Sequence, residues 1–116
     1  MIIRKDNLQK AVEEPSMGGE GVLHIDFMTS VLPSGYAVTT FARASLEPSS
    51  SVGYHVHEDN CEAYYIISGE GEYSDDGQIS IVCAGDLTFT SEGHGHGLKN
   101  ATDSSLDFIA LIIRKI

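Results

Sequence analysis

The chain has 116 residues, of which 41% are hydrophobic and 21% are charged, and this suits a globular domain with a buried core. Lys and Arg number 7 against 17 Asp and Glu, so the net charge is −10. A surface this acidic repels phosphate groups, which argues against nucleic acid and anionic membranes as partners. A small neutral or weakly charged ligand remains possible as a partner, as does any site where a bound cation reverses the local field.

The N-terminal stretch, residues 1–21, lacks the apolar core of a secretory signal, and no run approaches the ~20 apolar residues of a spanning helix. The chain has two cysteines, Cys61 and Cys83, which are able to form one disulfide. Without a signal segment, two reduced and packed thiols are the expected state. These features predict a cytoplasmic protein.

In chain order, the sequence predicts one short helical segment followed by strands. Residues 5–14 can form one or two helical turns before Pro15 ends them. Beyond residue 20 the apolar residues mostly recur with a period of two, and Asp76-Gly77 is a hairpin signal between two such runs. The predicted strands are 22–30, 36–46, 52–57, 63–69, 71–74, 79–83, 87–90, 94–100 and 106–114. Regularly spaced short strands of this kind predict an all-β sandwich or barrel in a single domain.

The last predicted strand, residues 106–114, is apolar on both faces. One face can fill the interior of the barrel, and the other must be covered by something else. Residues 1–30 of the same chain are one candidate cover, and a second copy of the chain is the other. We expect a homodimer, because a barrel this small leaves little chain to cover an outer face.

Two histidines and a carboxylate lie close together in the middle of the chain. His55 and His57 are two residues apart, so they share one face of a strand. Glu62 follows five residues after His57, which on one straight strand would place it on the opposite face. The intervening residues 58–60 (EDN) favour a turn, and a bend there lets Glu62 point back to the same interior.

A second pair, His94 and His96, also shares a face by the same period. The glycines around them, at 93, 95 and 97, leave room for a sharp turn or for the close approach of a ligand. Tyr64 has the parity of Glu62 and can offer a phenol to the interior. Tyr54 and Cys61 have the opposite parity, and we expect them to face away from the metal. Phe89, Leu98 and Phe108 are candidates for apolar walls of the pocket, and the alternative for each is simple core packing.

Two stretches of the chain resemble the two motifs of the cupin superfamily. Residues 55–69 resemble the first, G-x5-H-x-H-x(3,4)-E-x6-G, and residues 85–100 resemble the second, G-x5-P-x-G-x2-H-x3-N. Ser49 replaces the first glycine and Ser91 replaces the proline. Both positions shape loops, and neither is a ligand position in the motifs.

The resemblance implies a double-stranded β-helix, the cupin or jelly-roll barrel. It implies a single cupin domain over residues 1–116, with a core barrel at about 20–114 and an N-terminal extension at 1–19. It also implies a divalent metal inside the barrel, held by His55, His57, Glu62 and His96. His94 matches no ligand position, and we expect it at the mouth of the pocket, as an acid/base, as a support for a ligand or as a solvated side chain.

The chemistry of these residue types agrees with a metal site. Three neutral imidazoles and one carboxylate around a 2+ ion leave a local charge of +1, which a barrel interior tolerates better than a bare carboxylate. Nitrogen and oxygen donors without thiolate suit Fe, Mn, Ni, Co, Cu or Zn. The alternative is a hydrogen-bonded polar plug, in which every one of these side chains needs its own partner.

Function does not follow from the fold alone, and three hypotheses remain. The first is a metal-dependent enzyme, of the dioxygenase, decarboxylase or isomerase type, acting on a small organic molecule with His94 or Tyr64 as catalytic proton carriers. The second is a non-catalytic module that binds a sugar or a carboxylate at the metal. The third is a structural barrel with an adventitious ion.

Overall fold

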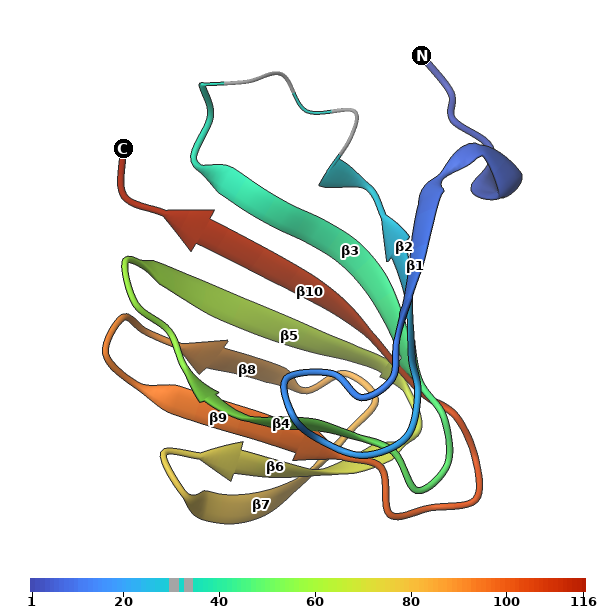
Figure 1. Ribbon diagram of the computed structural model, residues 1–116, viewed down its shortest axis with the longest axis vertical. Coiled ribbons are helices and arrows are strands. Elements are labelled where there is room, and N and C mark those ends of the chain that lie inside the picture. The colour runs from blue at the N-terminus through green and yellow to red at the C-terminus, as the bar shows by residue number, and fades with distance from the viewer. Residues whose placement is uncertain (30–31, 33–34) are drawn as a thin grey trace.

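The chain folds into two antiparallel β-sheets (Figure 1). The computed structural model describes residues 1–29, 32 and 35–116. The elements are η1 (Lys5–Asn7), β1 (Gln9–Glu13), β2 (Leu23–Phe27), β3 (Val38–Leu46), β4 (Ser51–Val56), β5 (Asn60–Ser68), β6 (Glu70–Asp75), β7 (Gln78–Cys83), β8 (Leu87–Thr90), β9 (Gly95–Lys99) and β10 (Leu106–Arg114). One sheet has the strand order β1-β2-β3-β10-β5-β8, and the other has the order β4-β9-β6-β7. The fold is the double-stranded β-helix that the motifs predicted.

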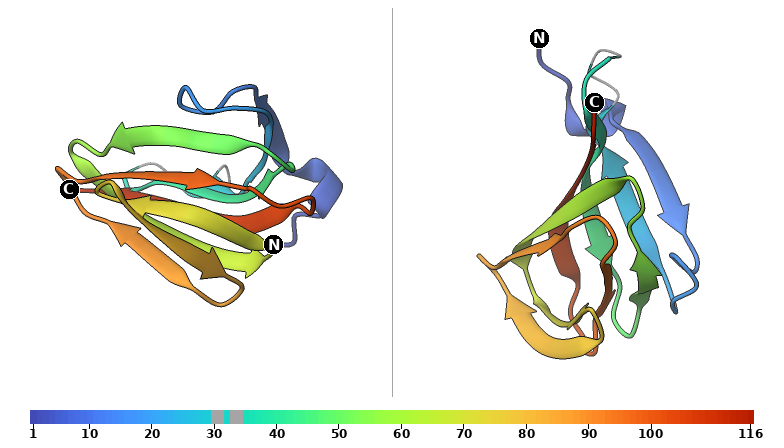
Figure 2. Two further views of the ribbon diagram at one scale, coloured as in Figure 1. Left: turned by 90° about the horizontal axis from the view of Figure 1, so that it is seen from below. Right: turned by 90° about the vertical axis from the view of Figure 1, so that its left-hand side faces the viewer.

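The core lies between the two sheets, which face each other as two layers (Figure 2). β10 occupies the middle of the six-stranded sheet, with β3 and β5 on either side. Its inward residues Leu106 and Phe108 are at most 1% exposed, and Leu98 of β9 meets them from the opposite sheet. Phe108 lines the main cavity and is the apolar wall that was predicted, whereas Leu98 is a core residue outside the cavity lining.

The prediction that Phe89 forms an inner wall is wrong. The side chain is 58% exposed, whereas its neighbours Thr88 and Thr90 are buried. β8 is an edge strand that turns its hydroxyl groups inward and its apolar side chains outward, so the apolar residues of this strand do not mark its inner face.

The helical interpretation of residues 5–14 is also wrong for most of its length. Only Lys5–Asn7 form a 3-10 turn, and Gln9–Glu13 form strand β1, which pairs antiparallel with β2. Pairing with the open edge of β2 outweighs the weak local helix preference of this stretch. The predicted strand 22–30 ends at Phe27, and its last residue lies outside the described residues.

The N-terminal strands extend the six-stranded sheet at its edge beside β3, and they do not cover its outer face. The outward residues Ile109 and Leu111 of β10 remain partly exposed. Next to them, Tyr65 is 48% exposed, and Leu87 and Phe89 are 67% and 58% exposed. Among the described residues, an apolar band on β10, β5 and β8 is therefore left without cover from residues 1–29.

Both cysteines are free thiols, Cys61 partly buried and Cys83 exposed, so the expectation of two reduced thiols holds. The expectation that both are packed fails for Cys83. In the part of the chain that the structure describes, no helix is long and apolar enough to cross a membrane.

Candidate metal centre

Three histidines and a glutamate meet between the two sheets, and we call them the His3Glu cluster: His55, His57, Glu62 and His96. His55 on β4 lies directly opposite His96 on β9 in the strand register. His57 follows the last residue of β4, and Glu62 reaches across from β5 in the other sheet. The barrel thus brings together residues separated by up to 41 positions, as between His55 and His96.

A tight turn sets the direction of Glu62. Asp59 adopts a left-handed backbone conformation with φ of 64°, which Asp tolerates better than most residues. The chain reverses there and enters β5 at Asn60, so that Glu62 faces the two histidines from the opposite sheet. The bend that the sequence predicted at residues 58–60 is present.

The ligand atoms of the cluster are closely spaced. Nε2 of His96 lies 3.0 Å from Nε2 of His57 and 3.1 Å from Nε2 of His55. Oε1 of Glu62 lies 3.1 Å from Nε2 of His57, 3.0 Å from that of His96 and 4.0 Å from that of His55. All four ligand atoms lie within 4.8 Å of one another.

Two backbone or amide oxygens fix the tautomers of the first two histidines. Nδ1–H of His55 donates to the carbonyl oxygen of Gly53, and Nδ1–H of His57 donates to Oδ1 of Asn60, both at 2.7 Å. Because each proton sits on Nδ1, the Nε2 atom carries a lone pair that faces the cluster. Burial, with a smaller contribution from the neighbouring imidazoles, lowers the pKa of His55 and so favours the neutral ring.

His96 is held from behind by a tyrosine. Its Nδ1 lies 3.0 Å from the hydroxyl of Tyr73, which is also 2.8 Å from Oγ1 of Thr90. A chain in which Nδ1–H donates to Tyr73 and Tyr73 donates to Thr90 satisfies all three groups. It leaves the Nε2 lone pair of His96 directed at the cluster, as in the other two histidines.

The donor set fits a divalent cation better than a polar plug. Three Nε2 lone pairs and one carboxylate converge with no proton available between the imidazoles, and such a contact is repulsive without a positive charge. With metal–ligand bonds of about 2.1 Å, ligands at right angles lie about 3.0 Å apart and tetrahedral ligands about 3.4 Å apart. The spacings of 3.0 and 3.1 Å match the right-angle arrangement, which leaves further positions around an ion open.

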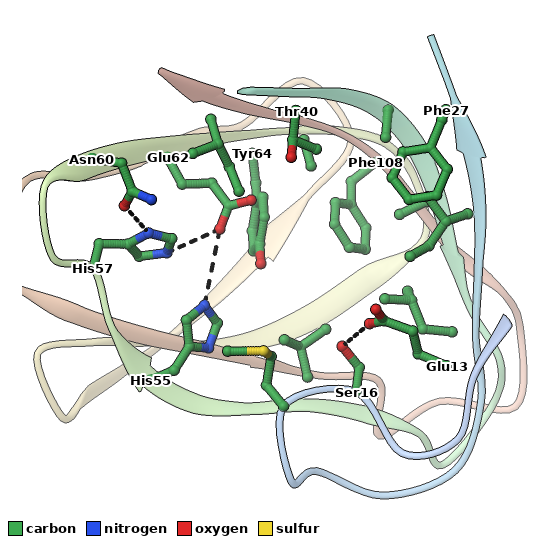
Figure 3. A pocket seen from close by; sticks show the side chains of 18 of the residues that line it. Glu13, Ser16, Phe27, Thr40, His55, His57, Asn60, Glu62, Tyr64 and Phe108 are labelled. Carbon is green, nitrogen blue, oxygen red and sulfur yellow. Dashed lines mark hydrogen bonds and ion pairs between the residues drawn. The ribbon is translucent and has the colours of Figure 1, made fainter. Parts of the chain in front are cut away.

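The cluster lies beside a cavity of about 490 Å³ (Figure 3). His55, His57 and Glu62 line one end, and most of the wall is apolar, with Phe27 and Phe108 on the far side in this view. No Lys or Arg is among the described residues that line it. An ion in the cluster would therefore face a ligand-sized, largely apolar space.

Tyr64 projects into this cavity, as its parity predicted. It is 4% exposed and stacks on His96 with ring centroids 4.8 Å apart and an interplanar angle of 24°. Burial, and then the charge of Glu62, raise the pKa of Tyr64 well above its usual value. The phenol is thus protonated at neutral pH and can donate a hydrogen bond.

His94 does not line the cavity, so the expected place at its mouth is wrong. Its side chain is 57% exposed, and Nδ1 pairs with Oδ2 of Asp76 at 2.5 Å. β9 begins only at Gly95, so His94 belongs to the preceding turn, where the two-residue period does not apply. Of the options that the sequence left open, the solvated side chain is the one that matches this placement.

Sequence reasoning missed the side chains that support the cluster. Asn60 is the first residue of β5 and follows His57 by three residues, a spacing from which a short amide can bond back to the ring, so its signal was present. Tyr73 carries no such local signal, because it is 23 residues from His96 and meets it only through the β6–β9 pairing. Tyr54 faces away from the cavity and Cys61 is outside its lining, as predicted.

With this geometry in hand, comparison with known proteins assigns the class. The cupin domain family matches residues 42–112, more than half of the chain. The chain belongs to the cupin family.

Three individual proteins illustrate what this chain is similar to. The chain is 35% identical over 113 residues to the oxalate-binding protein of Thermotoga maritima, covering 97% of this chain and 93% of that protein. The crystal structure of a predicted oxalate decarboxylase from Thermotoga maritima superposes with a TM-score of 0.89 at 33% identity, covering 99% of this chain and 100% of that one. A sugar phosphate isomerase of the cupin superfamily from Silicibacter pomeroyi has a TM-score of 0.79 at 19% identity, covering 99% of this chain and 76% of that one, and shares the fold.

Proposed function

We propose that this cupin binds a divalent transition metal through the His3Glu cluster and uses it to hold a small organic ligand in the adjoining cavity. The observation that carries this proposal is the convergence of three Nε2 lone pairs and Glu62 within 4.8 Å at one end of that cavity. The relative named as an oxalate-binding protein supports a ligand with carboxylate oxygens. The donor set leaves Fe, Mn, Ni, Co, Cu and Zn as candidates.

The chain's own residues have distinct tasks in this proposal. Gly53, Asn60 and Tyr73 fix the ring orientations of the three histidines, so that little reorganisation is needed on loading. A bound ion would supply Lewis acidity and open positions for ligand oxygens. Tyr64 offers a protonated phenol from the cavity wall, and the apolar walls exclude water from the ligand.

Catalysis is the second candidate function, and Tyr64 favours it. Two titratable side chains outside the cluster are among the described residues that line the cavity. Tyr64 is buried, whereas Glu13 is exposed. A buried phenol next to the cluster is placed to give a proton to a bound substrate. Tyr64 is therefore the catalytic residue that we propose for an oxidoreductase, lyase or isomerase activity, and His94 is left out.

Elemental analysis followed by calorimetry tests the binding proposal. Protein purified without an affinity tag should contain about one transition-metal ion per chain, and oxalate should bind the loaded protein but not the chelator-treated protein. Cys61→Ala is the control, because Cys61 is outside the cavity and should change neither result. Equal oxalate binding with and without metal would contradict the proposal.

A turnover screen separates binding from catalysis. Small carboxylates are incubated with the loaded protein while O2 uptake, CO2 release and isomer formation are recorded. If the protein is an enzyme, Tyr64→Phe should lower turnover and leave metal content unchanged, because the ring stays and only the hydroxyl is lost. Ligand binding without any turnover would support the binding module.

We also propose that the chain forms a homodimer through the apolar band on β10, β5 and β8. The band is self-complementary in character, since apolar side chains meet apolar side chains across a two-fold axis. Leu87 is its most exposed member at 67%. Sedimentation should find a dimer that Leu87→Asp weakens, whereas Ile79→Asp on β7 should not; a monomeric wild-type protein would contradict this.

Finally, we propose that residues 1–116 work as one cupin domain in the cytoplasm. β1 pairs with β2, so the N-terminal residues share the sheet of the barrel, and the free thiols suit a reducing compartment. Unfolding followed by circular dichroism and by Tyr fluorescence should give coincident transitions, and two separate transitions would contradict a single domain.

A further inference from the structure

The cavity has a second polar end, away from the metal cluster. Glu13 and Ser16 lie there, at the opposite side of the cavity from His57 and Asn60 (Figure 3). We call these two residues the Glu13–Ser16 pair. Glu13 is exposed, while Ser16 is 3% exposed.

The Glu13–Ser16 pair is held in place by the surrounding backbone. Oγ of Ser16 donates to Oε1 of Glu13 at 2.7 Å. The carbonyl oxygen of Ser16 accepts from the N–H groups of Gly19 and Gly53 at 2.9 and 3.0 Å, which ties this segment to β4. Glu13 itself is paired in register with Leu23 on β2. The carboxylate is therefore positioned over the cavity by both sheets.

The carboxylate of Glu13 has no cationic partner among the described residues. None of the salt bridges within 4.0 Å involves it, and no described Lys or Arg lines the cavity. Ser16 supplies one hydrogen bond, and a carboxylate can accept several more. Glu13 thus presents free acceptor capacity toward the cavity.

Charge balance separates two kinds of ligand. A 2+ ion with three neutral imidazoles and Glu62 has a net charge of +1, which a monoanionic ligand neutralises. A dianion such as oxalate leaves an excess negative charge in a cavity that also contains Glu13 and whose described lining includes no Lys or Arg to offset it. The cavity therefore favours a ligand with one negative charge at the metal end.

The size and the lining of the cavity also favour a larger monocarboxylate over oxalate. A volume of about 490 Å³ falls in the range of about 300–1,000 Å³ that is typical of pockets for drug-sized ligands, and it is far larger than oxalate needs. Between its two ends, the cavity wall includes Ile25, Phe27, Ala44 and Phe108. A ligand that fills this space must bring an apolar body.

We propose that the ligand is a metal-chelating monocarboxylate, such as a 2-oxo or 2-hydroxy acid, whose apolar body ends in a hydrogen-bond donor that binds Glu13. This inference rests on the proposed metal-dependent binding and specifies its ligand. The carboxylate and the neighbouring oxygen face the His3Glu cluster, and the far hydroxyl or ammonium group donates to the free oxygen of Glu13. Ser16 is a positioning residue, since it acts through Glu13.

The test uses metal-loaded full-length protein and isothermal titration calorimetry. The probes are linear 2-oxo acids of increasing length, each with and without a terminal hydroxyl group, together with oxalate. A hydrogen bond to a charged acceptor contributes enough that, at the matching length, the hydroxyl group should strengthen binding by about tenfold or more. That best probe should also bind more tightly than oxalate.

Glu13→Ala should abolish the preference for the hydroxylated probe, while Glu14→Ala, a change at the next position and outside the cavity lining, should retain it. Metal content should be the same in both variants. A series in which no length shows a hydroxyl preference, or a preference that survives Glu13→Ala, would overturn this inference and leave the proposed function intact. Failure of every probe, oxalate included, to bind the loaded protein would overturn both.

Discussion

The chain contains two His-x-His pairs, and the structure uses them differently. His55 and His57 both turn into the cavity, whereas of the second pair His96 is fully buried in the cluster and His94 lies on the surface. The spacing in the sequence is identical. The difference arises because His94 precedes β9, in a turn that follows Gly93 with φ of 85°. His57 also lies one residue outside its strand, just past β4, yet it keeps the face of His55. Side-chain parity therefore extends past that strand end and fails at His94, where the left-handed Gly93 turns the chain.

The hydrogen-bond partners of His55 and His57 differ from the partner of His94 in the same way. The rings of His55 and His57 donate through Nδ1 to neutral oxygens, which leaves Nε2 free for an ion. The ring of His94 faces the carboxylate of Asp76, and both side chains are about half exposed. The inner rings are arranged as ligands, and the outer ring contacts a carboxylate at the surface, where such a pair contributes little to stability.

The largest expected effect separates the two members of the second pair. His96→Ala removes one of four ligand atoms and should weaken metal binding by more than about 100-fold, since even indirect supports of a ligand contribute 10–100-fold. His94→Ala should leave metal content unchanged. Elemental analysis after dialysis measures both, and equal metal loss in the two variants would reject the assignment of the cluster.

Metal removal should come next in size. When the free metal concentration is about 100 times the Kd, bound metal stabilises the folded protein by about 2.7 kcal/mol. For a chain of this size a chelator should then lower the Tm by about 10 °C. Wild type and His94→Ala should both show this drop, and His96→Ala should not. A chelator shift in His96→Ala as large as that of wild type would contradict the account.

A smaller effect is expected from the side chain that orients His57. Asn60→Ala removes the acceptor of Nδ1 and should lower metal affinity by roughly 10–100-fold. Asp76→Ala removes the equivalent partner of His94 and should not change metal affinity. Competition with a coloured chelator gives both values, and an unchanged affinity in Asn60→Ala would show that the turn, not the amide, orients the ring.

The smallest effect is expected on the stability of the fold at low pH, through Asp76 and its contact with His94. The Gly95 N–H, and then His94, lower the pKa of Asp76 below its usual 3.8, so the carboxylate stabilises the fold above that pH. This contribution is lost as the pH falls through the lowered pKa. Asp76→Asn should therefore be slightly less stable than wild type in urea at pH 6 and equal to it near pH 2. A stability gap that persists at the lower pH would assign the effect to packing instead.

The strand faces and the four cluster residues were accessible from the sequence. A period of two assigns inner and outer faces wherever a residue lies well inside a strand, as for Tyr64 and Phe108. The motif spacing identified His96 without any knowledge of its neighbours. These features depend on local pattern, which the sequence carries directly.

Other features depend on pairing between distant segments. β1 exists because the edge of β2 is free, and nothing within residues 9–13 indicates that partner. Phe89 points outward because an edge strand need not bury its apolar face in the barrel. Tyr73 supports His96, and Glu13 faces the cavity, only because the sheets bring them there. Such contacts follow from the assembled barrel and have no local signature.

Anomalous diffraction from crystals grown with a divalent transition metal would locate a bound ion relative to the His3Glu cluster. We expect one strong peak between the three imidazoles and Glu62, at about 2.0–2.2 Å from each ligand atom. No peak at that position, with the rings turned apart or the metal bound only at the surface beside His94 and Asp76, would contradict it.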